Sequence, residues 1–80
     1  MNAKQAVAVR IQELCKERGI TVNTLANMAG TSPSTIYSML NTKSKNPGVV
    51  SLQKICDGLE ISIRDFFNDD LFDNIEQEII

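Results

Sequence analysis

Residues 21–40, TVNTLANMAGTSPSTIYSML, predict two short helices joined by a tight turn. Thr21 can cap the first helix, and Gly30 ends it because glycine adopts the left-handed conformation that terminates helices. Ser32 followed by Pro33 is the sharpest local signal in the chain. A serine at the N-cap accepts a backbone N–H, and a proline at the first helical position loses no hydrogen bond. The second helix then runs to the end of this segment.

Helical spacing of apolar residues continues on both sides, and no strand-like alternation lasts long enough to matter. One helix is expected over residues 4–18, ending at Gly19, and another over residues 50–58. Their buried stripes are Val7, Ile11, Leu14 and Cys15 in the first, and Leu52, Ile55, Cys56 and Leu59 in the second. Ser62 is expected to cap a fifth helix, with Asp65 three residues later forming a weak capping box.

The last residues are acidic but keep an apolar pattern. Apolar side chains recur at spacings of three and four, which predicts a sixth, amphipathic helix; they are Leu71, Phe72, Ile75 and Ile79. The expected fold class is therefore all-α, a compact five-helix domain over residues 1–67 with a short amphipathic C-terminal extension over residues 68–80.

Composition excludes several classes of protein. The chain has 80 residues, no histidine and two cysteines, Cys15 and Cys56. Without histidine, a zinc site, a Ser–His–Asp triad and a Cys–His pair are excluded, so we expect no enzyme, no metal and no cofactor. There is no room for a domain that senses a small molecule, and no signal peptide, disulfide framework or membrane-spanning run, which predicts a cytoplasmic protein.

The net charge of −2 is the sum of two segments of the chain with opposite charge. Residues 1–65 hold all eight basic residues and five acidic ones, a charge of +3. Residues 66–80 hold five acidic residues and no basic one, a charge of −5. A mildly basic body can therefore bind phosphates, provided that the acidic tail points away from them.

The paired helices of residues 21–40 have the geometry of a helix-turn-helix, whose second helix fits the major groove of DNA. The residues around them add a wider pattern, in order: Arg10-Ile11, Gly19-Ile20-Thr21, Leu25-Ala26, Gly30-Thr31-Ser32, Ile36, Asn41, Lys43, Asn46-Pro47, Leu52, Ile55-Cys56, Leu59, Ile61-Ser62 and Phe66-Phe67. Over about residues 7–67 this pattern resembles the λ-repressor/Cro-like helix-turn-helix family, the XRE-type regulators.

The resemblance implies a sequence-specific regulator of transcription, expected to be a repressor, that binds double-stranded DNA with helix 33–40 in the major groove. It places base contacts on Ser34, Thr35, Tyr37 and Ser38. It places phosphate contacts on Thr21, Asn23, Asn41, Lys43, Lys45 and Asn46.

The chain departs from the family pattern at several of these positions. Val22 stands where the family often has glutamine, and Pro33 offers a base edge no hydrogen bond. Cys15 stands where the family commonly has an arginine on the first helix, and Leu40 stands where it has a glutamate after the recognition helix. In the family these two residues commonly form an ion pair, so we expect the two apolar side chains to pack together here. The alternative function is a protein-interaction module of the same fold, antitoxin-like or a regulatory partner, with little affinity for DNA.

Each assignment also has a plainer alternative. Tyr37 could be a core aromatic, but Ile36 and Leu40 are expected to hold the inward stripe, which turns Tyr37 outward. Lys43 and Lys45 could be ordinary solvated loop residues, and Ser34 and Ser38 could be solvated serines without a contact. Cys15 and Cys56 are expected to be small core residues rather than redox sensors.

The apolar stripe of the tail predicts the oligomeric state. An 80-residue core has little spare inner surface to cover it. We therefore expect a homodimer built from residues 66–80, which would place two recognition helices about one DNA turn, ~34 Å, apart on a palindromic site.

Overall fold

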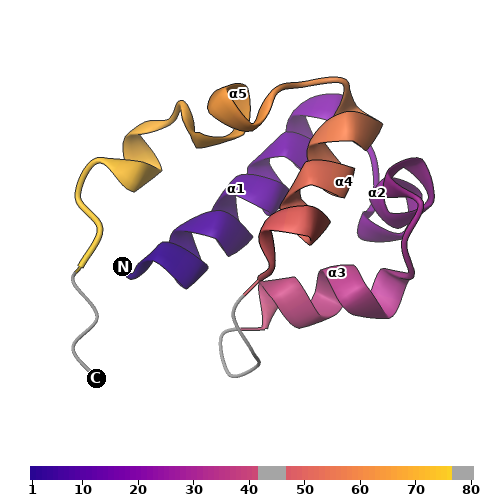
Figure 1. Ribbon diagram of the computed structural model, residues 1–80, viewed down its shortest axis with the longest axis horizontal. Coiled ribbons are helices and arrows are strands. Elements are labelled where there is room, and N and C mark those ends of the chain that lie inside the picture. The colour runs from indigo at the N-terminus through magenta and orange to yellow at the C-terminus, as the bar shows by residue number, and fades with distance from the viewer. Residues whose placement is uncertain (42–46, 77–80) are drawn as a thin grey trace.

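The computed structural model describes residues 1–41 and 47–76 of the chain, and each regular element within them is helical. The elements are α1 (Ala3–Arg18), α2 (Val22–Ala29), α3 (Pro33–Leu40), α4 (Val49–Leu59), α5 (Ile63–Phe67) and the short 3-10 helix η1 (Asp70–Phe72). This order confirms the all-α, five-helix fold class expected from the sequence (Figure 1). Among the described residues, no helix has the length and hydropathy needed to cross a membrane.

Local capping sets the ends of most helices. Gly19 and Gly30 adopt the left-handed conformation, with φ of 63° and 68°, and end α1 and α2. Glycine takes this conformation without the steric cost that a Cβ would impose. The side chains of Thr21, Ser32 and Ser62 each accept the backbone N–H three residues ahead, at the starts of α2, α3 and α5. Each bond satisfies a donor that has no partner within its helix.

The core lies where α1, α2, α3 and α4 meet, and Phe66 of α5 is fully buried against it. Its side chains are Val7, Ile11, Leu14, Cys15, Leu25, Ala26, Ala29, Ile36, Met39, Leu52, Ile55, Cys56, Leu59 and Phe66. The stripes expected on the first and fourth helices are all among them. On α3 the inward residues are Ile36 and Met39, whereas Leu40 is only partly buried. Leu40 still packs against the core, and the inward residue that the sequence analysis did not identify is Met39.

Both cysteines are buried members of this core. Burial raises the pKa of the Cys15 and Cys56 thiols, and for Cys56 the Asp57 and Asp65 carboxylates raise it further. The thiols therefore stay protonated and unreactive near neutral pH, as small core residues do. Leu40 packs against the same cluster that contains Cys15, and a direct contact between the two stays a prediction.

Helices α2 and α4 approach closely at Gly58. A Cβ added there would lie 2.7 Å from the carbonyl carbon and oxygen of Met28 and 2.9 Å from the backbone nitrogen of Ala29. These atoms belong to the last turn of α2, so the backbones of the two helices touch at this point. The absence of a side chain at Gly58 thus sets how α2, the first helix of the pair, sits on the core.

The tail differs from the expected sixth helix. Residues 70–72 form a single 3-10 turn, residues 73–76 are not helical, and Ile79 lies outside the described residues. Phe72 turns back onto the core, with its ring 4.8 Å from that of Phe67 and 6.3 Å from that of Phe66. The apolar spacing is therefore used to fold the chain back onto its own body, and no continuous stripe forms along a helix.

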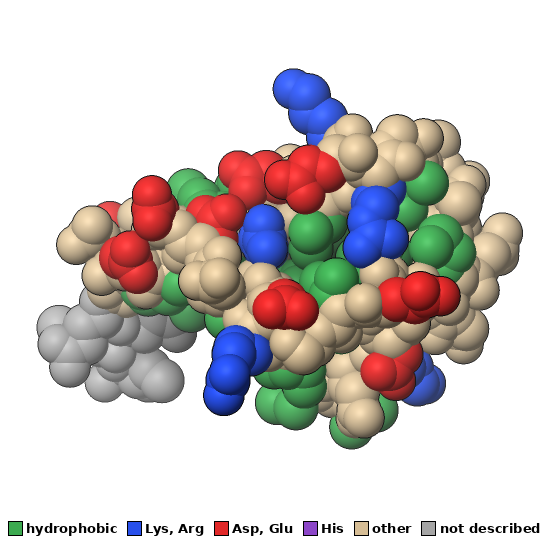
Figure 2. All heavy atoms as spheres, turned by 90° about the horizontal axis from the view of Figure 1, so that it is seen from above, with side chains coloured by type: hydrophobic (Ala, Val, Ile, Leu, Met, Phe, Trp, Pro, Cys, Tyr) green, Lys and Arg blue, Asp and Glu red, His purple; other side chains and the backbone are tan. Residues whose placement is uncertain are grey.

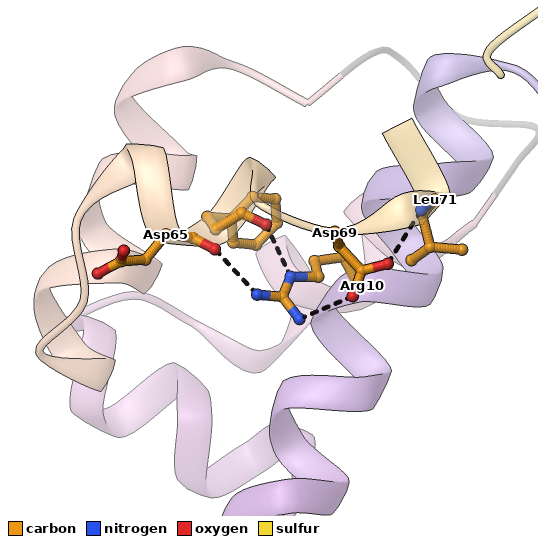
Figure 3. A network of polar contacts seen from close by, with 5 residues as sticks. Arg10, Asp65, Asp69 and Leu71 are labelled. Carbon is orange, nitrogen blue, oxygen red and sulfur yellow. Dashed lines mark hydrogen bonds and ion pairs between the residues drawn. The ribbon is translucent and has the colours of Figure 1, made fainter. Parts of the chain in front are cut away.

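Arg10 ties this returning segment to α1 (Figure 3). Its side chain is nearly buried, and its Nε donates to the carbonyl of Phe66 at 2.7 Å. Its Nη2 donates to the carbonyl of Asp65 at 2.9 Å, and its Nη1 pairs with the Asp69 carboxylate at 3.3 Å. The guanidinium therefore gives the carbonyls at the end of α5 a charged donor, beside the Asn68 N–H that the Asp65 carbonyl accepts at 3.3 Å, and it places a positive charge at the C-terminus of the helix.

The elements place α3 and α5 on opposite sides of the molecule. In Figure 1, α3 runs along the bottom and α5 along the top, with α1 and α4 between them. Figure 2 looks onto the α5 side, where acidic side chains gather around a few basic ones. The side that carries α3 is therefore turned away from the acidic tail residues of η1.

Candidate nucleic-acid interface

Helices α2 and α3 are joined by a short turn and pack against each other. The turn begins with two backbone hydrogen bonds that close α2, from Gly30 N–H to the Asn27 carbonyl at 3.2 Å and from Thr31 N–H to the Ala26 carbonyl at 3.0 Å. Ser32 then starts α3 two residues after Gly30. This turn and the two eight-residue helices match the helix-turn-helix arrangement expected from the sequence.

The outer face of α3 is polar and accessible. Ser34, Tyr37 and Ser38 are exposed, and 53% of the Tyr37 surface remains accessible. Because positions i, i+3 and i+4 share one helix face, these three side chains point to the same side. Thr35 lies beside them and is partly buried. The exposed position of Tyr37 agrees with the interpretation that it is not a core aromatic, while base contact by these residues stays a prediction.

Three hydroxyl groups meet at the start of α3. The Ser32 Oγ lies 3.1 Å from the Ser34 Oγ and 2.9 Å from the Thr35 Oγ1, and it accepts the Thr35 N–H at 3.3 Å. Two of the four residues expected to contact bases are therefore held by the residue that caps the helix. The sequence analysis identified Ser32 as a cap but did not connect it with these neighbours.

The expected phosphate contacts divide into two groups. Thr21 and Asn23 lie exposed at the start of α2, where the Thr21 Oγ1 accepts the Thr24 N–H at 3.1 Å and donates to the Thr24 Oγ1 at 3.0 Å. Asn41 is exposed at the C-terminal end of α3. Lys43, Lys45 and Asn46 lie outside the described residues.

An open hollow connects α3 with the beginning of α4. It has a volume of about 320 Å³ and is lined by Ser34, Thr35, Ser38, Met39, Pro47, Gly48 and Ser51. Gly48 is the N-cap of α4, so the start of this helix borders the same surface as the outer face of α3. Sequence reasoning assigned no role to Ser51, which lies in the first turn of α4.

The charge along the chain favours an anionic partner on this side. Between Glu17 and Asp57 the sequence contains no acidic residue, and its charged side chains there are Arg18, Lys43, Lys45 and Lys54. This interval contains the whole of α2 and α3, and its charge is +4. The acidic residues of the sequence lie in α1, at the end of α4 and in the segment that follows. A polyanion approaching α3 therefore meets no carboxylate on α2 or α3.

Comparison with known proteins agrees with this geometry. Residues 10–70 match the family model described as the Cro/C1-type HTH DNA-binding domain. Among solved structures, the prophage Lp1 protein 11 is similar, with 30% identity and a TM-score of 0.81, covering 94% of this chain and 100% of that one. A tyrosine-to-phenylalanine mutant of the restriction-modification controller protein C.Esp1396I is also similar, with 29% identity and a TM-score of 0.71, covering 84% of this chain and 86% of that one. None of the curated proteins matches the sequence.

Proposed function

The chain belongs to the Cro/C1-type helix-turn-helix family of DNA-binding domains, and on that premise we propose that it is a sequence-specific transcriptional repressor. In this proposal α3 enters the major groove of double-stranded DNA and the first turn of α2 contacts the phosphate backbone. The similarity to a restriction-modification controller protein supports a regulatory role.

The observation that carries the proposal is the outer face of α3. Ser34, Tyr37 and Ser38 are exposed together on a helix that has no acidic residue, within a segment of charge +4. Hydroxyl groups donate to and accept from base edges, and the absence of carboxylates lets the phosphates approach. Since Pro33 has no N–H and no polar side chain, sequence discrimination rests on the residues that follow it.

Phosphate contact by Lys43 and Lys45 is tested by the salt dependence of binding. Each released counterion contributes about −0.9 to the slope of log K against log[salt] on duplex DNA. Lys43→Ala and Lys45→Ala should each weaken binding to all DNA sequences alike and flatten this slope by about one unit. Lys16→Ala is the matched control, because Lys16 is an exposed lysine of α1 to which no phosphate contact is assigned, and its slope should equal that of the parent.

Two results would count against the proposal in different ways. An unchanged slope in both loop variants would remove these lysines from the interface while leaving DNA binding intact. No binding to any DNA at low salt would favour the alternative function, a protein-interaction module of the same fold.

A homodimer on a palindromic site completes the proposal. We propose that residues 1–67 form the DNA-binding domain and that residues 66–80, which include the extension over residues 68–80, form the pairing surface. Two side chains in the described part of this surface support pairing, because Phe67 is 38% exposed and Ile75 is 36% exposed. In this proposal, pairing through these residues keeps the acidic side chains that follow α5 away from the phosphates that α3 approaches.

Substitution of these two side chains tests the dimer. Ile75→Glu combined with Phe67→Ala should convert a dimer into a monomer in sedimentation at tens of micromolar, since it removes apolar area and adds like charges to both copies. Val50→Glu is the matched control, because Val50 is 65% exposed at the start of α4 and should leave the mass unchanged. A parent chain that already sediments as a monomer, or a double variant that stays dimeric, would show that pairing does not use this surface.

A further inference from the structure

The cap of α3 lies within hydrogen-bonding distance of two residues that face the DNA in the proposed function. Ser32 Oγ has three partners within hydrogen-bonding distance: the Thr35 N–H at 3.3 Å, the Thr35 Oγ1 at 2.9 Å and the Ser34 Oγ at 3.1 Å. All three residues belong to the exposed beginning of one helix, and Pro33 between them carries no competing donor.

The chemistry of a hydroxyl limits how these bonds can be directed. Ser32 Oγ has one proton and two lone pairs, so it donates once and accepts twice. The Thr35 N–H can only donate, and it takes one of the two lone pairs. Of the two neighbouring hydroxyls, therefore, one donates to the remaining lone pair and the other accepts the Ser32 proton. Ser34 and Thr35 together keep a single O–H that is available to a ligand.

We infer that Ser32 is a positioning residue for base recognition, which makes the Ser34–Thr35 pair select adenine over guanine. In the major groove guanine presents two acceptors, N7 and O6, whereas adenine presents one acceptor, N7, and one donor, N6–H₂. One free O–H and one accepting oxygen complement adenine and leave one guanine acceptor without a donor. This inference rests on the proposed function, because it requires α3 to lie in the major groove.

The test compares three replacements of Ser32 that each permit a helix start. Ser32→Thr keeps a hydroxyl, Ser32→Gly removes it at a small capping cost, and Ser32→Asp replaces it with a group that only accepts. The bound sequence is first selected from a random DNA pool. Affinities are then measured for duplexes that carry adenine or guanine at each position of that sequence.

Different results are expected from the Gly and Asp variants. Ser32→Gly frees the hydroxyl protons of both Ser34 and Thr35, so guanine can then be bound through both of its acceptors. The ratio of the affinity for adenine to that for guanine at the contacted position should therefore fall by about fivefold or more, the lower end of what a good base contact contributes. Ser32→Asp takes the hydroxyl protons of both Ser34 and Thr35, which removes one bond to adenine and one to guanine, so the ratio should stay near that of the parent while affinity falls for every sequence. Ser32→Thr should keep the ratio of the parent, and helix content is compared by circular dichroism.

Two further variants separate failure of the inference from failure of the proposed function. Ser34→Ala and Thr35→Ala should change the preference at one base pair or two adjacent pairs. If neither changes any preference, the proposed base contacts are wrong. If they do change it while Ser32→Gly and Ser32→Thr give the same ratio as the parent, the contacts stand and the role of Ser32 is overturned.

Discussion

Arg10→Ala is expected to lower the free energy of unfolding by about 3–5 kcal/mol, the cost of breaking a buried ionic network by removing one partner. Only 9% of the Arg10 surface is exposed, and its guanidinium holds two backbone carbonyls and one carboxylate. The carbonyls of Asp65 and Phe66 would lose a charged donor at the end of α5, and Asp69 would lose its counter-ion. For a chain of this size, each kcal/mol lowers Tm by about 4–8 °C.

Arg64→Ala is the matched control for this measurement. Arg64 is exposed on α5, and among the described residues it makes no hydrogen bond or ion pair, so its loss should change stability by less than about 0.5 kcal/mol. Arg10→Lys should fall between the two, because an ammonium group cannot reproduce the fork of a guanidinium. Urea unfolding followed by circular dichroism gives all three values. Equal midpoints for Arg10→Ala and Arg64→Ala would show that the network does not hold the tail.

Gly58→Ala is expected to destabilise the protein by about 1–3 kcal/mol, the usual cost of forcing an extra group into a packed site. The sign is informative, because glycine to alanine inside an open helix stabilises by about 0.8–1 kcal/mol. Here the new Cβ would lie 2.7 Å from the backbone of Met28, so α2 must move away from α4. Since α3 is joined to α2 and packs against it, a displacement of α2 should also displace α3, and affinity for DNA should fall.

Gly48→Ala provides the comparison for this substitution. A Cβ at Gly48 meets nothing within 4 Å, and its φ of −83° suits any residue. The change should therefore alter stability by less than about 1 kcal/mol, which reflects only the weaker capping by alanine. A Gly58→Ala variant as stable as the parent would mean that α2 and α4 can separate without loss.

Helix ends could be predicted from the sequence because their determinants are local. Thr21, Ser32 and Ser62 bond to the backbone three residues ahead, and Gly19 and Gly30 end helices through their own conformation. The capping box at the start of α1, formed by Asn2 and Gln5, carries the same kind of local signal. The sequence analysis did not use it and began that helix one residue late.

The conformation of the C-terminal extension, residues 68–80, was harder to predict. The periodicity of apolar residues describes one segment and not the surface against which that segment packs. The spacing of Leu71, Phe72 and Ile75 suits an amphipathic helix, yet Phe72 packs onto Phe66 and Phe67 after a single 3-10 turn. On α3, likewise, Met39 is buried and Leu40 only partly so, because the surface that α3 covers is formed by α1 and α2 and cannot be seen in the sequence of α3 alone.

The sequence by itself therefore determined the five α-helices, the caps at Thr21, Ser32 and Ser62, the core stripes of α1 and α4, and the acid-free segment that contains α2 and α3. Only the tertiary structure decided the role of Arg10. In the sequence it is one positive charge, whereas in the fold it bonds to Asp65, Phe66 and Asp69, which are between 55 and 59 positions further along the chain. The tertiary structure also decided that Gly58 must lack a side chain. Capping and periodicity act within one or two helical turns, whereas these contacts form only when distant segments meet, and no local pattern encodes that meeting.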